Sequence, residues 1–187
     1  MVTEKPRIKL TYEDYRSTPD DKRYELLDGE LILAPAPRTT HQRTLFELTL
    51  NIGQHVKDRD LGEVFTAPTD VFLTDTDVVQ PDLSFISKNR AGIITELNIQ
   101  GAPDLVVEVL SPSTASRDRG YKRSLYARHG VREYWMAGVE SATITVLLLG
   151  EDGFDVFGTF GEGERFVSPT LDGFEVEIDV VFGLGPS

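Results

Sequence analysis

Two apolar runs near the middle of the chain have the pattern of buried β-strands, and each contains one acidic residue. Residues 105–110 (LVVEVL) are apolar on both faces except at Glu108, and residues 78–86 (VVQPDLSFI) contain Asp82. Apolar runs rich in β-branched residues are typical of central strands that are covered on both sides. A carboxylate within such a strand is costly unless a partner binds it. The pattern therefore predicts two neighbouring core strands, each with a bound carboxylate.

The other elements follow from hydrophobic periodicity, caps and turn residues. In chain order we expect a short helix at 11–18, a hairpin at 23–33, a long helix from residue 39 to about 61, strands at 64–65 and 71–73, a helical connection at 89–100, a helix at 117–129, and strands at 133–136 and 143–149. A Thr cap and Pro19 bound the first helix, and Asp28-Gly29 is a strong hairpin turn. We expect the apolar residues of the helical connection, Leu97 among them, to pack inward.

The last third of the chain has short apolar segments separated by glycine. Residues 150–187 contain glycine at turn spacing, which predicts a meander of short strands. Before it, the helix at 117–129 directs Leu125 and Tyr126 to the core and ends at Gly130, the usual residue after a helix C-terminus. Strands with helices on both sides of a central pair predict a layered α/β or α+β architecture.

Composition predicts a single cytoplasmic domain. At 187 residues the chain is long enough for a hydrophobic core, so we expect one domain over residues 1–187. It has no cysteine, which excludes disulfide bonds and thiolate metal sites. Residues 1–6 are polar where a signal peptide would be apolar. No apolar run is long enough for a membrane span, so we expect no membrane partner.

The two acids and a nearby lysine form a set that could bind a metal. Residues 118–122 (DRGYK) open the helix that follows the Glu108 strand and supply Lys122. Mg²⁺ prefers oxygen ligands, often one or two carboxylates, and keeps several waters. A bound water loses a proton more readily and can attack phosphorus, while a lysine can stabilise the negative charge that develops. The alternative is structural, with a buried Glu108 that pairs with an arginine or caps a loop.

Several segments resemble one bacterial protein family. They are 23–30 (RYELLDGE), 79–83 (VQPDL), 102–114 (APDLVVEVLSPST), 118–122 (DRGYK) and 126–135 (YARHGVREYW). These segments are similar to those of the Uma-two family, a group of restriction endonucleases within the PD-(D/E)XK nuclease superfamily. The resemblance extends over nearly the whole chain. It implies a restriction-endonuclease-like α/β (α+β) fold, a mixed β-sheet flanked by helices, here with an antiparallel C-terminal extension.

The resemblance also implies a function. It indicates a Mg²⁺- or Mn²⁺-dependent endodeoxyribonuclease that hydrolyses DNA phosphodiester bonds, with Asp82, Glu108 and the backbone carbonyl of Val109 as metal ligands. The superfamily signature places a lysine two residues after the second acid, but residue 110 is leucine. We therefore expect Lys122 to supply the catalytic cation, unless it only pairs with the acid four residues before it. Nucleases of this type often cut two strands as C₂ pairs, so we expect a homodimer.

Three further residues have both functional and structural interpretations. Glu25 could complete the acidic cluster as a catalytic residue, or it could pair across the hairpin with Arg23. His41, at the start of the long helix, could contact phosphate or donate a hydrogen bond to a metal ligand, but we favour a surface or structural role because a lone histidine carries little signal. Asp104 follows a proline at a strand start, and we interpret it as a turn or capping acid.

The charge distribution leaves other functions open. The net charge of −12 is unfavourable for binding phosphate. However, residues 150–187 carry nine acids and one base, whereas residues 117–133 carry six Arg or Lys and two acids, so a local basic face can exist.

The main alternative to an active nuclease is a nuclease-fold protein that binds nucleic acid or a protein partner without catalysis. Metal binding between Asp82 and Glu108 distinguishes the two. A third hypothesis is a hydrolase of smaller phosphoesters, which would have a closed pocket.

Overall fold

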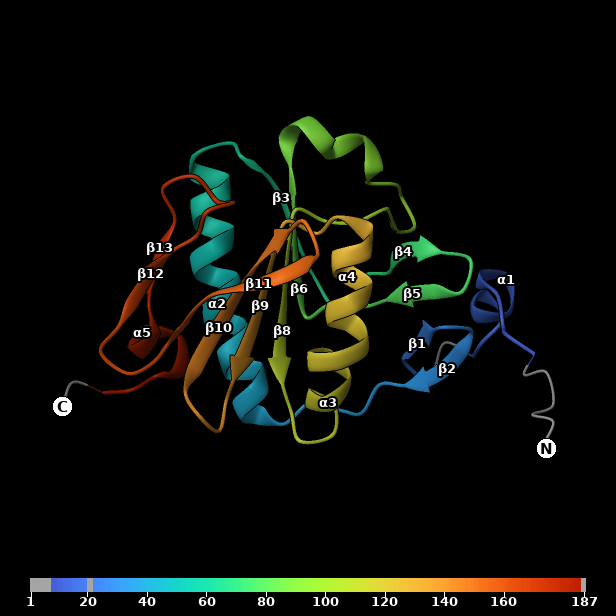
Figure 1. Cartoon of the computed structure of the whole chain (residues 1–187), viewed down its shortest axis with the longest axis horizontal. Helices are drawn as coiled ribbons and strands as arrows, with labels where there is room; N and C mark the ends of the chain where they lie inside the picture. Colours follow the sequence, from blue (N-terminus) through green and yellow to red (C-terminus); the bar gives the residue numbers. More distant parts are fainter. Residues whose placement is uncertain (1–7, 20–21, 186–187) are drawn as a thin grey trace.

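A mixed six-stranded sheet forms the centre of the molecule (Figure 1). The computed structural model of the chain describes residues 8–19 and 22–185. The central sheet has the order β11-β10-β9-β8-β6-β3 and consists of β3 (Gly62–Thr66), β6 (Leu83–Ser87), β8 (Leu105–Leu110), β9 (Glu133–Gly138), β10 (Thr143–Gly150) and β11 (Gly153–Phe160). Strands β8 and β9 run parallel, and the remaining neighbours pair antiparallel. The expected mixed sheet is therefore confirmed.

Helices cover both faces of this sheet (Figure 1). They are α2 (Thr39–Asp58) and α5 (Ile178–Phe182) on one face, and the continuous segment α3 (Ala115–Arg117), η2 (Asp118–Lys122) and α4 (Arg123–His129) on the other. Val107 and Val109 of β8 belong to the core shared with α2, whereas Val106 and Leu110 belong to the core shared with α4. Because side chains alternate along a strand, Glu108 points to the face covered by α4.

A second, five-stranded sheet lies beside the central one. Its order is β2-β1-β5-β4-β7, formed by β1 (Tyr24–Leu27), β2 (Glu30–Leu33), β4 (Val71–Thr74), β5 (Asp77–Val79) and β7 (Ile99–Gln100). Helix α1 (Tyr12–Arg16) packs on it through Tyr15. The expected hairpin is confirmed, because β1 pairs with β2 around Asp28 and Gly29. Both turn residues have positive φ, as this class of tight hairpin turn requires.

Residues 78–86 do not form one strand, so this prediction is wrong. The run divides into β5 in the second sheet and β6 in the central sheet, with Gln80, Pro81 and Asp82 between them. Proline has no N–H to donate to a sheet ladder and therefore interrupts a strand that would otherwise continue. The division has a functional consequence, since it places Asp82 at the junction of the two sheets rather than inside a strand.

The connection at 89–100 is helical only in its first half, so the expected inward packing of Leu97 is also wrong. A 3₁₀ helix spans Lys88–Ile93, after which β7 joins the second sheet. Leu97 is 76% exposed. The hydroxyl of Thr95 accepts hydrogen bonds from the N–H groups of Leu97 and Asn98, which stabilises a turn instead of a further helical turn.

The expected antiparallel C-terminal extension is present. Strand β11 pairs antiparallel with β10, and β12 (Arg165–Val167) pairs antiparallel with β13 (Glu175–Glu177). Helix α5 was not expected, because its five residues lie directly between a short strand and Gly183 and show too little helical periodicity. In the part of the chain that the structure describes, no helix is both long and apolar enough to cross a membrane.

Candidate functional site

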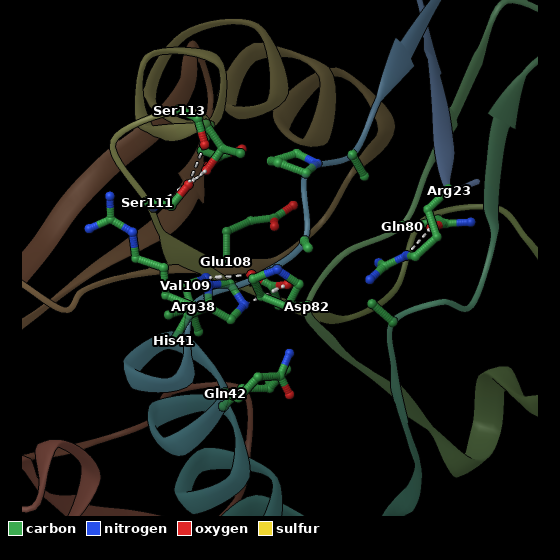
Figure 2. A pocket seen from close by; sticks show the side chains of 18 of the residues that line it. Arg23, Arg38, His41, Gln42, Gln80, Asp82, Glu108, Val109, Ser111 and Ser113 are labelled. Carbon is green, nitrogen blue, oxygen red and sulfur yellow. Dashed lines mark hydrogen bonds and ion pairs between the residues drawn. The ribbon is translucent and has the colours of Figure 1, made fainter. Parts of the chain in front are cut away.

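Asp82 lies where the chain passes from the second sheet into the central one. It directly precedes β6, whose residue Leu83 pairs with Val107 of β8. Its Oδ2 accepts a hydrogen bond from the backbone N–H of Val109 at 2.8 Å. Its Oδ1 lies 3.3 Å from Nε2 of His41, at the start of α2. Figure 2 shows these side chains at the pocket that both sheets border. The carboxylate of Asp82 is thus held from two sides.

Glu108 projects from β8 toward the helical segment that follows it. The residue is 4% exposed, and its Oε1 accepts hydrogen bonds from Nζ of Lys122 at 2.9 Å and from the hydroxyl of Tyr126 at 2.7 Å. Burial raises the pKa of Glu108 to about 8, although the charge of Lys122 opposes the shift. The bound carboxylate predicted from the strand pattern is therefore present, with a lysine and a tyrosine as partners.

Lys122 comes from a π-helical turn. The five residues of η2 form this wider turn, a feature that is frequent at functional sites. Nζ of Lys122 lies 2.7 Å from Glu25 Oε1 and 2.9 Å from Glu108 Oε1, against 3.9 Å from Asp118 Oδ1. Burial alone would lower the pKa of Lys122, but the carboxylates of Glu108 and Glu25 outweigh burial and raise it. Lys122 is therefore a buried cation whose nearest partners are not the acid four residues before it.

Glu25 reaches the same cluster from the second sheet. Its Oε1 accepts a hydrogen bond from the backbone N–H of Gln80 at 2.9 Å, and its Oε2 lies 3.7 Å from a guanidinium nitrogen of Arg117. Arg23, the alternative partner across the hairpin, donates instead to Oε1 of the Gln80 side chain at 3.3 Å (Figure 2). Glu25 is thus a member of the acidic cluster, and Gln80 links it to the chain just before Asp82.

One pocket of about 420 Å³ is lined by Glu25, Asp82, Glu108 and Lys122. It lies between the connection that follows β2 and the loop that follows β8, and Glu25, Glu108 and Lys122 form its deep part, each 4% exposed. Its polar lining also includes Arg23, Arg38, His41, Gln42 and Arg117. Cationic side chains around a carboxylate cluster suit a ligand that combines a phosphate with a metal ion.

Asp104 lies outside this pocket. It is fully buried just before β8 and accepts hydrogen bonds from the N–H and the hydroxyl of Ser87, both at 2.8 Å. A guanidinium nitrogen of Arg90 lies 3.1 Å from its other oxygen. These partners of Asp104 thus come from the end of β6 and from the 3₁₀ helix that follows it.

His41, Tyr126 and Asp118 lie close to the predicted site residues, although sequence reasoning favoured no site role for them. Nε2 of His41 lies 3.3 Å from Oδ1 of Asp82 and the side chain lines the pocket, a position that suits both a structural role and a contact with phosphate. Tyr126 was expected to face the core, but its hydroxyl reaches Glu108. Asp118 is buried near Lys122. The spacing of four between residues 118, 122 and 126 was the available signal, because it places the three on one helix face.

The oxygen atoms of Asp82 and Glu108 fit a hard divalent cation. Both hydrogen bonds to Glu108 end on Oε1, and within the described residues no group donates to Oε2. Across residues 8–19 and 22–185, no three His, Cys, Asp or Glu side chains are arranged to hold a metal ion by themselves. Mg²⁺ is usually bound through one or two carboxylates with waters completing its shell. Two carboxylates and the Val109 carbonyl are a donor set of this kind.

The carboxyl group of Glu108 is expected to titrate well above the ordinary range of glutamate in the metal-free protein. Its pKa of about 8 exceeds the usual 4.5 because of burial, so between these values the folded chain binds more protons than the unfolded chain. The stabilisation from this group is complete below pH 4.5 and is lost as the pH rises through about 8. NMR of ¹³C-labelled glutamate side chains measures the titration, with Glu108→Gln to assign the signal. Mg²⁺ should lower the apparent pKa of Glu108. An ordinary glutamate pKa that does not change when Mg²⁺ is added would contradict a metal site shared by Asp82 and Glu108.

The chain is similar in sequence and in fold to known proteins. The sequence model of the Uma2 family, described as "Putative restriction endonuclease", matches residues 11–180. A protein of Synechocystis described as "Uncharacterized protein slr1290" is 26% identical over 181 residues, which cover 95% of this chain and 93% of that protein. A crystal structure from Anabaena variabilis, titled as a "putative nuclease belonging to DUF820", is similar in fold with a TM-score of 0.79, at 20% identity over 93% of this chain and 98% of that one. Because the family model covers most of the sequence, the chain belongs to the Uma2 family, as the segments around Asp82 and Glu108 predicted.

Proposed function

We propose that this chain is a Mg²⁺- or Mn²⁺-dependent endonuclease that hydrolyses DNA phosphodiester bonds. The observation that carries the proposal is the convergence of Glu25, Asp82, Glu108 and Lys122 in one pocket. They come from β1, the β5–β6 connection, β8 and η2, so only the folded chain brings them together. Membership of the Uma2 family supports the nuclease class.

Asp82, Glu108 and the carbonyl of Val109 would hold the cation. When bound, it would supply a water that loses its proton near neutral pH and a positive charge beside the phosphate. The protein orients the ligand atoms in advance, because the N–H of Val109 holds Oδ2 of Asp82, and Lys122 holds Oε1 of Glu108. Oε2 of Glu108 would then face the cation, and so would Oδ1 of Asp82, whose other neighbour is Nε2 of His41 at 3.3 Å.

Lys122 acts as a proton donor in hydrogen bonds rather than as a base, since the adjacent carboxylates raise its pKa. Its ammonium group has three N–H bonds, and two carboxylate oxygens lie within 2.9 Å of Nζ. The third N–H is available to a water or to a phosphate oxygen, where it would stabilise the charge of the transition state. Glu25 keeps Lys122 charged and in place.

The cations at the pocket would bind the DNA backbone. Arg23, Arg38 and Arg117 line the pocket beside the acids. Each phosphate that they neutralise releases counterions, so affinity should fall steeply with salt. A local site of this kind allows an acidic protein of net charge −12 to bind DNA, because screening limits the repulsion from distant carboxylates to about 10 Å at 0.1 M salt.

The second candidate function is binding of nucleic acid or of a protein partner without catalysis. The observation that favours it is the pairing of Lys122 with both Glu25 and Glu108, which offsets one of their two negative charges without a metal. A cluster that is already paired gains less from a cation than an unpaired cluster does. The two candidates therefore differ in metal affinity as well as in cleavage.

Plasmid cleavage tests the proposal directly. Supercoiled plasmid is incubated with the full chain and Mg²⁺, Mn²⁺ or a chelator, and nicked and linear products are quantified. We expect cleavage with either metal and none with the chelator. Single-stranded DNA, RNA and a small phosphodiester, used in parallel, identify the substrate class. Binding of DNA without cleavage at any metal concentration would favour the second candidate.

A further inference from the structure

The hydroxyl of Tyr126 contacts Glu108, although the tyrosine ring belongs to the core. Tyr126 lies in α4, is fully buried and packs with Leu125 and Val106 in the core on that face of the sheet. Its hydroxyl donates a hydrogen bond of 2.7 Å to Oε1 of Glu108. A phenylalanine would fill the same core volume, so packing alone does not account for a hydroxyl at this position.

Two donors meet on one oxygen of Glu108. Lys122 and Tyr126 both donate to Oε1, and among the described residues none donates to Oε2. A carboxylate oxygen accepts about two hydrogen bonds, so Oε1 is saturated and Oε2 keeps its lone pairs for another ligand. Two donors that approach from different residues also fix the rotation of the carboxylate about its last bond. The arrangement therefore distinguishes the two oxygens of one side chain.

We infer that Tyr126 is a positioning residue that holds Glu108 with Oε2 directed to the divalent cation. The inference rests on the proposed function, because it assigns Tyr126 to the same metal site. Partners that orient a metal ligand without touching the metal commonly change metal affinity by 10- to 100-fold when they are removed. Tyr126 would act in this way, while Lys122 serves both the carboxylate and the substrate.

Tyr134 provides a matched control. It is fully buried like Tyr126, and the two rings lie 5.2 Å apart in an edge-to-face contact. Its hydroxyl donates to the backbone carbonyl of Asp118 at 3.1 Å and not to Glu108. Tyr134→Phe therefore removes a hydroxyl of the same kind from the same core without touching the carboxylate.

Mn²⁺ binding to the metal-free full chain distinguishes a positioning role of Tyr126 from a role in core packing alone. Electron paramagnetic resonance of free Mn²⁺ gives the dissociation constant for the parent, Tyr126→Phe, Tyr134→Phe and Glu108→Gln, and thermal unfolding in chelator shows that each is folded. For Tyr126→Phe we expect Mn²⁺ affinity to fall about 10- to 100-fold, with KM for DNA unchanged at saturating Mn²⁺. Tyr134→Phe should bind Mn²⁺ like the parent. Equal affinities for Tyr126→Phe and the parent, or equal losses in both tyrosine variants, would overturn the inference while leaving the metal site intact.

Two further outcomes complete the test. If the parent binds no Mn²⁺, or if Glu108→Gln binds it like the parent, the proposed metal site is wrong and the role of Tyr126 falls with it. Should Tyr126→Phe fail to fold, ¹⁹F NMR of 3-fluorotyrosine in the parent gives an independent readout. Mg²⁺ should then shift the ¹⁹F signal of Tyr126, which is recognised as a Mg²⁺-sensitive signal that is still present in Tyr134→Phe. If Mg²⁺ shifts no such signal, the inference is refuted.

Discussion

Asp82→Asn is expected to lower metal-dependent DNA cleavage by about 10³-fold. The substitution keeps the shape of the side chain but removes its charge and one ligand oxygen. A bound metal contributes several kcal/mol of transition-state stabilisation, and each ~1.4 kcal/mol corresponds to a factor of ten in rate. The remaining amide oxygen can still accept the hydrogen bond that Oδ2 receives from Val109, so the fold should persist. Cleavage of supercoiled plasmid under single-turnover conditions measures the change.

Asp152→Asn is the matched control for this experiment. Asp152 is exposed in the turn between β10 and β11 and carries the same charge, but it does not line the pocket around Asp82. We expect its cleavage rate to equal that of the parent. If Asp82→Asn also cleaves within tenfold of the parent rate, while folded and at saturating metal, Asp82 is not a ligand of the catalytic cation.

Lys122→Met is expected to lower the cleavage rate by about 10²- to 10³-fold, the usual effect of removing one donor that stabilises transition-state charge. Methionine replaces the length of the side chain without its ammonium group. Lys122→Arg should recover little of the rate, because a planar guanidinium cannot take the place of a compact ammonium between Glu25 and Glu108. Both variants are assayed at saturating Mn²⁺, so that a loss of bound metal is not mistaken for the effect of losing the lysine ammonium group. A parent-like rate in Lys122→Met would show that the catalytic cation is elsewhere.

The same substitution should also lower the stability of the metal-free protein. Lys122 is the nearest cation to two buried carboxylates, and removing one partner of a buried pair typically costs about 3–5 kcal/mol. Urea unfolding of the metal-free variant measures this loss. Mn²⁺ should restore part of the stability, since it supplies positive charge to the same acids. A variant that is as stable as the parent in chelator would show that Glu25 and Glu108 do not need the lysine.

The local elements of this protein were readable from short segments. The Thr11 cap, the Asp28-Gly29 turn and Gly130 each act through their own backbone geometry, and each marks the boundary that the structure has. The strand around Glu108 was recognisable because an apolar run covered on both faces needs no distant information. Where a local signal was mixed, as at Pro81, the interruption of the strand was missed although its cause was visible in the sequence.

The candidate site was only partly predictable. Asp82, Glu108, Lys122 and Glu25 could each be chosen as an unusual residue in its own segment, and the structure places all four in one pocket. The contacts among these four residues could not be predicted from their separate segments. His41 and Tyr126 looked like an ordinary surface residue and an ordinary core residue, because nothing in their own segments indicates that an acid from another element lies opposite them.

By itself, the sequence determined most of the helices and strands, the family and the acids that require partners. Tertiary structure decided which groups became those partners. Glu25 meets Lys122 because the chain crosses between two sheets at Gln80, and Lys122 reaches the acids because a π-helical turn precedes α4. Hydrophobic periodicity reports which face of an element is buried, but not which element covers that face. Sheet order and strand register supply that information, and they depend on the packing of the whole chain.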